Sequence, residues 1–127
     1  MTRVILVCDN EEPLRALVRA TLEDEDYEIV EARDGHESLE LARSARPDLI
    51  VLDMMMPGRT GIEVLGELRR DEAFDATPVI MLTARTQSAD RATAESIGAD
   101  RFVAKPFSPR KFATTVAELL AEGRRER

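Results

Sequence analysis

Short apolar runs and longer amphipathic segments alternate along this chain. Three of the runs, 4–8, 49–52 and 79–82, are apolar throughout. An uninterrupted apolar run of this length, bounded by polar and turn-forming residues, is typical of a strand buried on both faces of a parallel sheet. Two weaker runs complete the set. The run 27–33 alternates between charged and apolar positions, which predicts an edge strand, and 101–104 predicts a short strand.

Apolar residues at helical spacing predict a helix after each strand, over the approximate ranges 14–22, 37–45, 61–68, 87–97 and 109–122. Pro13 suits a first helical turn, Pro47 ends the second helix, and Gly98 follows the fourth. In the first helix the residues at apolar spacing are Leu14, Leu17, Val18, Thr21 and Leu22. The polar segment 71–77 predicts a loop.

Five strand–helix units in succession predict an α/β fold with right-handed crossovers. We expect a doubly wound, flavodoxin-like architecture with a five-stranded parallel sheet in the order 2-1-3-4-5 and five helices on both faces. The three apolar strands should be the inner ones. We assign 1–122 to one domain and 123–127 to a C-terminal tail or the start of a linker.

Composition narrows the class of protein. The 127 residues are 43% hydrophobic and 34% charged, which suits one folded domain. The net charge of −7 argues against direct contact with nucleic acid, which needs a basic face. Cys8 is the one cysteine, so the chain has no internal disulfide and suits a reducing cytosol. No apolar run approaches a membrane span, and the first residues lead into a strand instead of a signal peptide, so we expect a cytoplasmic protein.

Polar residues with chemical potential follow the predicted strands. In a parallel sheet all strand carboxyl ends lie at one edge, which should bring together Asp9, Asn10, Glu11, Asp53, Thr83 and Lys105. Paired side-chain oxygens suit Mg2+, which keeps waters and accepts a phosphate oxygen. Asp53, at the end of the central strand, could then act as a nucleophile towards phosphorus. Lys105 provides a compact positive charge for a phosphoryl oxygen, and Thr83 a hydroxyl donor.

The order of these motifs resembles the receiver domain of bacterial two-component response regulators over nearly the whole chain. The matching segments are 7–15 with its acid cluster, 47–53, Met56-Pro57-Gly58 with Gly61, 79–84, Gly98-Ala99-Asp100 and Lys105-Pro106-Phe107. Each segment alone is a weak signal, whereas all of them in this order and spacing are specific.

The resemblance implies a role for each matching residue. Asp53 is similar to the aspartate that accepts a phosphoryl group from a phosphohistidine on a sensor histidine kinase or phosphotransfer protein. Asp9 and Asn10 fall on the acid pair that holds Mg2+, together with Asp53 and the main-chain carbonyl of Met55. Lys105 matches the lysine that pairs with the aspartate and then with its phosphate, and its bond to Pro106 should be cis.

The resemblance also implies a switch and its partners. Thr83 matches a hydroxyl that moves to bond the phosphoryl group, and Phe102 matches an aromatic ring that swings inward with it. The face made by the fourth helix, fifth strand and fifth helix would then change shape. A downstream protein or a fused output domain would read that face, and a phosphorylation-dependent dimer could form there. A receiver of this kind is not an enzyme beyond its own phosphorylation and dephosphorylation.

One departure from the family pattern leaves alternatives open. Asn10 stands where the family has the second metal-binding acid, which predicts weaker Mg2+ binding and slower phosphorylation. An atypical receiver that binds a partner without phosphorylation is therefore the second hypothesis. A shifted alignment, with Asp9 as the direct ligand and Cys8 beside it, fits less well. An Asp-nucleophile phosphatase would need an acid at Met55, and a flavin module would need a phosphate loop after the first strand.

Overall fold

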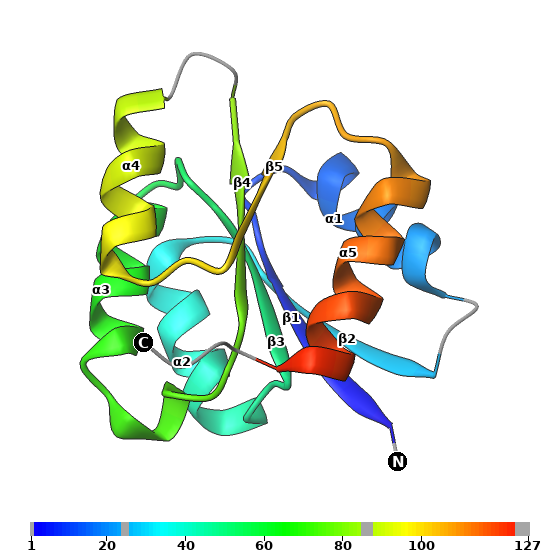
Figure 1. Cartoon of the computed structure of the whole chain (residues 1–127), viewed down its shortest axis with the longest axis horizontal. Helices are drawn as coiled ribbons and strands as arrows, with labels where there is room; N and C mark the ends of the chain where they lie inside the picture. Colours follow the sequence, from blue (N-terminus) through cyan, green and yellow to red (C-terminus); the bar gives the residue numbers. More distant parts are fainter. Residues whose placement is uncertain (1, 24–25, 85–87, 124–127) are drawn as a thin grey trace.

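A five-stranded parallel sheet forms the centre of the computed structural model, which describes residues 2–23, 26–84 and 88–123 (Figure 1). The strand order is β2-β1-β3-β4-β5, as the sequence predicted. The strands are β1 (Arg3–Cys8), β2 (Tyr27–Ala32), β3 (Leu49–Asp53), β4 (Val79–Thr83) and β5 (Arg101–Ala104). The three apolar strands are the inner ones, and all residues of β3 and β4 are buried.

Five α-helices cover the two faces of the sheet. They are α1 (Glu12–Leu22), α2 (Gly35–Ala45), α3 (Gly61–Arg69), α4 (Ser88–Ile97) and α5 (Pro109–Glu122). Helices α1 and α5 lie on one face, and α2, α3 and α4 lie on the other (Figure 1). This arrangement is the doubly wound, flavodoxin-like fold that the alternating pattern predicted.

Side chains alternate along the inner strands and so form two apolar clusters. Ile5 and Val7 point towards α1 and α5, where they pack with Val18 and Phe112. Leu6, on the opposite face of β1, packs in the cluster that α2, α3 and α4 cover. Both faces of β1 are therefore buried, which explains why its sequence does not alternate between polar and apolar residues.

Three local expectations need correction. The segment predicted as a loop contains a 3-10 helix, η1 (Glu72–Phe74), whose Phe74 side chain is 5% exposed in the core. The apolar spacing places Leu17 on the buried face of the first helix, but Leu17 is 41% exposed. Helix α2 begins at Gly35, two residues earlier than predicted, because the Asp34 side chain caps it by accepting from the Glu37 N–H.

Two expectations lie outside the described residues: the start of the fourth helix at Gln87, and the tail beyond Gly123. Within the described part, no helix combines the length and the apolar character that a bilayer crossing requires.

Candidate functional site

Three strand ends bring two carboxylates and one ammonium group together. Asp53 is the last residue of β3, Asp9 follows β1, and Lys105 follows β5. The Lys105 Nζ lies 3.0 Å from Asp9 Oδ2 and 3.1 Å from Asp53 Oδ1. Asp9 is fully buried and Asp53 is 5% exposed. The sequence prediction that residues separated by up to 96 positions meet at one edge is confirmed for these three.

The electrostatic balance of this cluster is negative. Burial raises the pKa of Asp53 from 3.8 to about 6, and the Asp9 charge adds to the rise, while Lys105 and a hydrogen bond from the Met55 main chain oppose it. Burial alone would lower the pKa of Lys105, but its hydrogen bond to Asp9 and its contact with Asp53 raise that pKa overall. One ammonium group therefore does not fully compensate two carboxylates.

The backbone around Asp53 is packed tightly against the start of α3. The Gly61 N–H donates to the Met54 carbonyl at 2.9 Å, and a Cβ at position 61 would lie 2.2 Å from the main-chain oxygen of Asp53. Only glycine allows this approach. Thr60 completes a capping box with Glu63, which fixes the first turn of α3 beside the site.

The backbone that presents Lys105 is also fixed. Its main-chain N–H donates to the Thr83 carbonyl at 2.8 Å, so β4 and β5 stay paired up to the site. The Lys105–Pro106 peptide bond is cis, as predicted. Lys105 also lies 3.6 Å from Glu11, whose side chain is largely exposed.

The remaining predicted residues lie around this cluster. Asn10 is exposed next to Asp9, and the Met55 side chain is 58% exposed beside its main-chain contact with Asp53. Thr83 is 5% exposed at the end of β4, the strand that pairs with β3. Phe102 is half-buried in β5, with the Arg91 guanidinium 4.7 Å from its ring centroid.

The donor set fits a small, hard divalent cation. Two buried or nearly buried carboxylates remain undercompensated, which is the environment that favours a cation with oxygen ligands. The described residues contain no group of three or more His, Cys, Asp and Glu side chains arranged for a metal. Asn10 follows Asp9 and Met55 lies two residues after Asp53, so the neutral oxygens of the Asn10 amide and the Met55 carbonyl are the further ligands that the sequence predicts.

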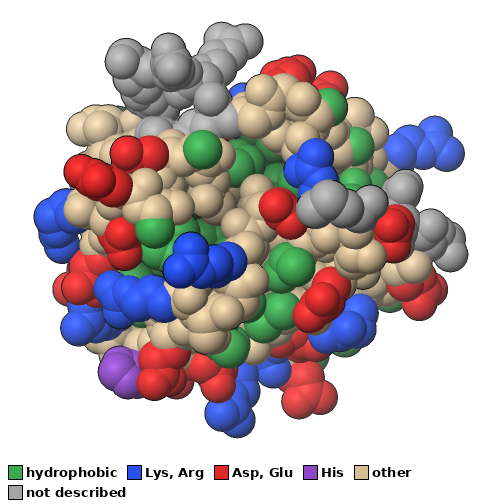
Figure 2. Space-filling model, turned by 90° about the horizontal axis from the view of Figure 1, so that it is seen from below, with side chains coloured by type: hydrophobic (Ala, Val, Ile, Leu, Met, Phe, Trp, Pro, Cys, Tyr) green, Lys and Arg blue, Asp and Glu red, His purple; other side chains and the backbone are tan. Residues whose placement is uncertain are grey.

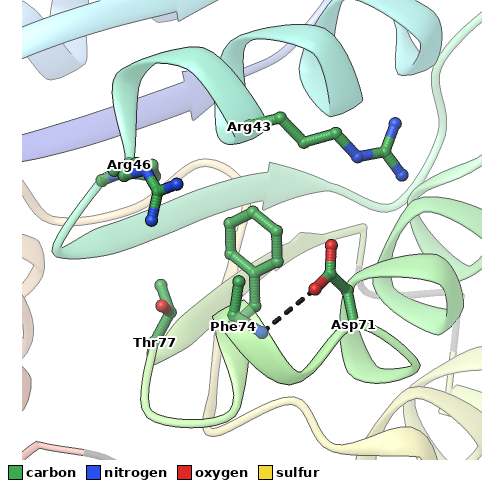
Figure 3. Close-up of a pocket in the computed structure, with 7 residues that line it drawn as sticks. Arg43, Arg46, Asp71, Phe74 and Thr77 are labelled. Carbon is green, nitrogen blue, oxygen red and sulfur yellow. Dashed lines mark hydrogen bonds between the residues drawn. The ribbon is translucent and has the colours of Figure 1, made fainter.

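A separate concavity lies at the opposite edge of the sheet. It has a volume of about 250 Å3 and lies between the end of α2 and η1, with Arg43, Arg46 and Phe74 in its wall (Figure 3). The Asp71 side chain there caps η1 by accepting from the Ala73 N–H. Acidic and basic side chains are mixed over the face seen from below (Figure 2). None of the predicted site residues lines this cavity, so the candidate chemistry belongs to the strand carboxyl ends.

Comparison with known proteins gives one consistent family. The family model described as the response regulator receiver domain matches residues 5–117. The transcriptional regulatory protein ResD of Bacillus subtilis (strain 168) is 46% identical over 116 residues, which cover 91% of this chain and 47% of ResD. The chain spans about half the length of the curated relatives it matches.

Solved structures agree with this result. The chemotaxis response regulator CheY4 of Vibrio cholerae has a TM-score of 0.87 at 33% identity, covering 94% of this chain and 99% of that one. The receiver domain of a sensor histidine kinase from Pseudomonas aeruginosa PAO1, with a magnesium ion coordinated in its active-site cleft, has a TM-score of 0.87 at 24% identity. That alignment covers 96% of this chain and 100% of the other. At this identity the second likeness concerns the fold alone.

Proposed function

The chain belongs to the response regulator receiver family of two-component systems and is not a conventional enzyme, and from this we propose that Asp53 accepts a phosphoryl group. The donor would be a phosphohistidine on a sensor histidine kinase or phosphotransfer protein. The observation that supports this proposal most directly is the Lys105 ammonium group 3.1 Å from a nearly buried Asp53 carboxylate, with Asp9 on its other side.

The chemistry follows from these contacts. An Asp53 oxygen attacks phosphorus while the phosphorus–nitrogen bond of the donor breaks, and the imidazole leaves with the electron pair and takes a proton from solvent. Lys105 is placed to pair with a phosphoryl oxygen. Transfer of this kind depends on alignment and on neutralising the phosphoryl oxygens more than on acid–base help.

A bound Mg2+ would supply the rest of the positive charge. Asp9, Asn10, Asp53 and the main-chain carbonyl of Met55 are the residues that would hold it. Asp9 is the best positioned of them, because the Glu11 N–H at 2.8 Å and Lys105 at 3.0 Å fix its two carboxylate oxygens. Mg2+ takes few protein ligands and retains waters, so one neutral amide among them is compatible with binding.

The proposed output is a change in the surface made by α4, β5 and α5. A new acyl phosphate adds nearly two negative charges at Asp53, and Thr83 would move to donate a hydrogen bond to it. Phe102 would then turn inward, which requires it to leave the Arg91 guanidinium. A downstream protein or a fused output domain would bind the altered surface, and a second copy of the chain could dimerise there. We place these events in the cytoplasm.

Direct phosphorylation tests the proposal. Purified protein with Mg2+ and acetyl phosphate should gain the mass of one phosphoryl group, measured on the intact chain. Asp53→Ala should abolish the gain, because among the described residues Asp53 is the nearly buried carboxylate that lies beside Lys105 together with Asp9. Asp48→Ala, which removes an exposed carboxylate at the other end of β3, is the matched control and should leave the gain intact.

Asn10, in place of an acid, supports a second candidate function. If the intact chain gains no mass, or if the gain survives in Asp53→Ala, the receiver acts as a binding module that does not depend on phosphorylation. In that case a partner should bind the unmodified protein and the Asp53→Ala variant with equal affinity.

A further inference from the structure

Arg15 is a buried charge beside the site that touches none of the reacting atoms. It is 6% exposed. Its Nη1 donates to the main-chain oxygen of Asp9 at 2.7 Å, and its Nε pairs with Glu31 Oε1 at 2.9 Å. A guanidinium withdrawn from water must recover its lost hydration from such partners. Arg15 therefore links the loop after β1 to the edge strand β2.

Glu31 is held from its other side by Arg19. The Arg19 Nη2 lies 2.7 Å from Glu31 Oε2 and also donates to the Ile29 carbonyl at 3.2 Å. The hydrogen bond from Arg19 is the main cause that lowers the pKa of Glu31, and Arg15 adds to it. Glu31 thus remains ionised between two guanidinium groups and fixes the direction in which Arg15 points.

This network fixes the peptide that leads into Asn10. The Asp9 N–H donates to the Ala32 carbonyl at 3.1 Å, and the Asp9 carbonyl accepts from Arg15. The Asp9 carbonyl lies in the same rigid peptide plane as the Asn10 N–H. Arg15 therefore sets the orientation of the peptide plane that joins Asp9 to Asn10, two of the proposed Mg2+ ligands.

We propose that Arg15 is a positioning residue for the metal-binding loop and that Glu31 and Arg19 support it. The proposal rests on the function proposed above, in which Asp9 and Asn10 hold Mg2+. Loss of Arg15 would remove the hydrogen bond that holds the Asp9–Asn10 peptide, so the Asn10 amide would have to be ordered at the moment of binding, while the Glu11 N–H and Lys105 still hold the Asp9 carboxylate. Mutation of residues that orient metal ligands lowers metal affinity by roughly tenfold to a hundredfold.

Mg2+ titration by calorimetry compares Arg15→Met with a matched control, Arg69→Met. Both arginine side chains are 8% exposed and pair with a carboxylate, Glu31 at 2.9 Å and Asp100 at 3.0 Å. Both also donate to main-chain carbonyls, but Arg69 lies at the opposite edge of the sheet. Circular dichroism verifies that each variant is folded at the titration temperature.

Arg15→Met should raise the Mg2+ dissociation constant roughly tenfold or more, whereas Arg69→Met should lower stability and leave that constant unchanged. Arg15→Lys should restore only part of the affinity, because one ammonium group cannot reproduce the fork that reaches both partners. If Arg15→Met is unfolded, Glu31→Gln and Arg19→Met test the proposal, since both variants keep Arg15. Each should raise the Mg2+ dissociation constant several-fold, which is less than the rise expected for the loss of Arg15 itself.

The outcomes separate the two proposals. If the wild-type protein binds Mg2+ and the folded Arg15 or Glu31 variants bind it with the same dissociation constant, the positioning role is overturned and the phosphoacceptor role stays intact. An equal loss of affinity in Arg69→Met also overturns it, because the effect would then be one of general stability. Wild-type protein that neither binds Mg2+ nor gains a phosphoryl group overturns both.

Discussion

The ionised Asp53 carboxylate should destabilise the metal-free fold, so Asp53→Asn should stabilise the protein at alkaline pH. The side chain is 5% exposed, and burial together with Asp9 raises its pKa from 3.8 to about 6. Asparagine keeps the shape of the side chain and removes the charge. The Lys105 ammonium group still has Asp9 at 3.0 Å in the variant.

The sign of the pH dependence follows from proton binding. Below pH 3.8 both the folded and the unfolded chain hold the proton. Between 3.8 and about 6 the folded chain holds a proton that the unfolded chain has lost, so wild-type stability falls as the pH rises through this window. Above about pH 6 the loss in the free energy of unfolding stays constant. A shift of this size corresponds to about 3 kcal/mol, or roughly 10 °C in Tm for a domain of this length.

Urea unfolding followed by circular dichroism, with a chelator and constant ionic strength, measures this difference. Asp53→Asn should be up to about 3 kcal/mol more stable than wild type near pH 8 and less than about 1 kcal/mol more stable near pH 4. Asp100→Asn is the control, because Arg69 and the Val79 N–H hold that carboxylate and its loss should destabilise the fold. A gain for Asp53→Asn that is absent, or equal at both pH values, would refute the reasoning.

Three further predictions concern the same site. Asn10→Asp should tighten Mg2+ binding by about tenfold. Two unit charges 4 Å apart interact by about 4 kcal/mol at an effective dielectric near 20, and repulsion among the acids offsets much of this gain. Equal affinities of the variant and the wild type in a calorimetric titration would contradict the prediction. Gly61→Ala should cost about 3 kcal/mol in urea unfolding, because its Cβ would lie 2.2 Å from the Asp53 main-chain oxygen. Gly66→Ala, with its nearest neighbour at 3.8 Å, should instead add about 0.5–1 kcal/mol. Lys105→Met should raise the pKa of Asp53 beyond about 6, followed by carboxyl carbon NMR, and a pKa that falls would exclude the assigned pairing.

The position of the site could be predicted because it depends on topology. Asp9, Asp53 and Lys105 each follow an apolar run, and a parallel sheet places all such ends at one edge. The start of α3 carries a further sequence signal that the prediction did not use, the T-x-x-E pattern of the Thr60–Glu63 capping box.

The support of the site could not be predicted in the same way. Arg15 occupies an ordinary polar position in a helix, and its burial depends on Glu31 of an edge strand 16 residues away. Leu17 is exposed because Val18 and Leu22 face the sheet and define the buried side of α1. Such outcomes depend on how a helix is rotated against its sheet, which the spacing of apolar residues defines only to within one position.

The magnitudes indicate what could drive the proposed switch. The contact between Arg91 and the Phe102 ring, at 4.7 Å, is of a kind worth about 0.5–1 kcal/mol at an exposed site. Ionising Asp53 costs the folded chain about 3 kcal/mol relative to the unfolded chain, by its pKa shift from 3.8 to about 6. A phosphoryl group would add further negative charge at the same point. A contact of about 0.5–1 kcal/mol changes a two-state equilibrium by only about fivefold or less, so we expect the switch to depend mainly on how Lys105, the metal ligands and Thr83 compensate charge at Asp53.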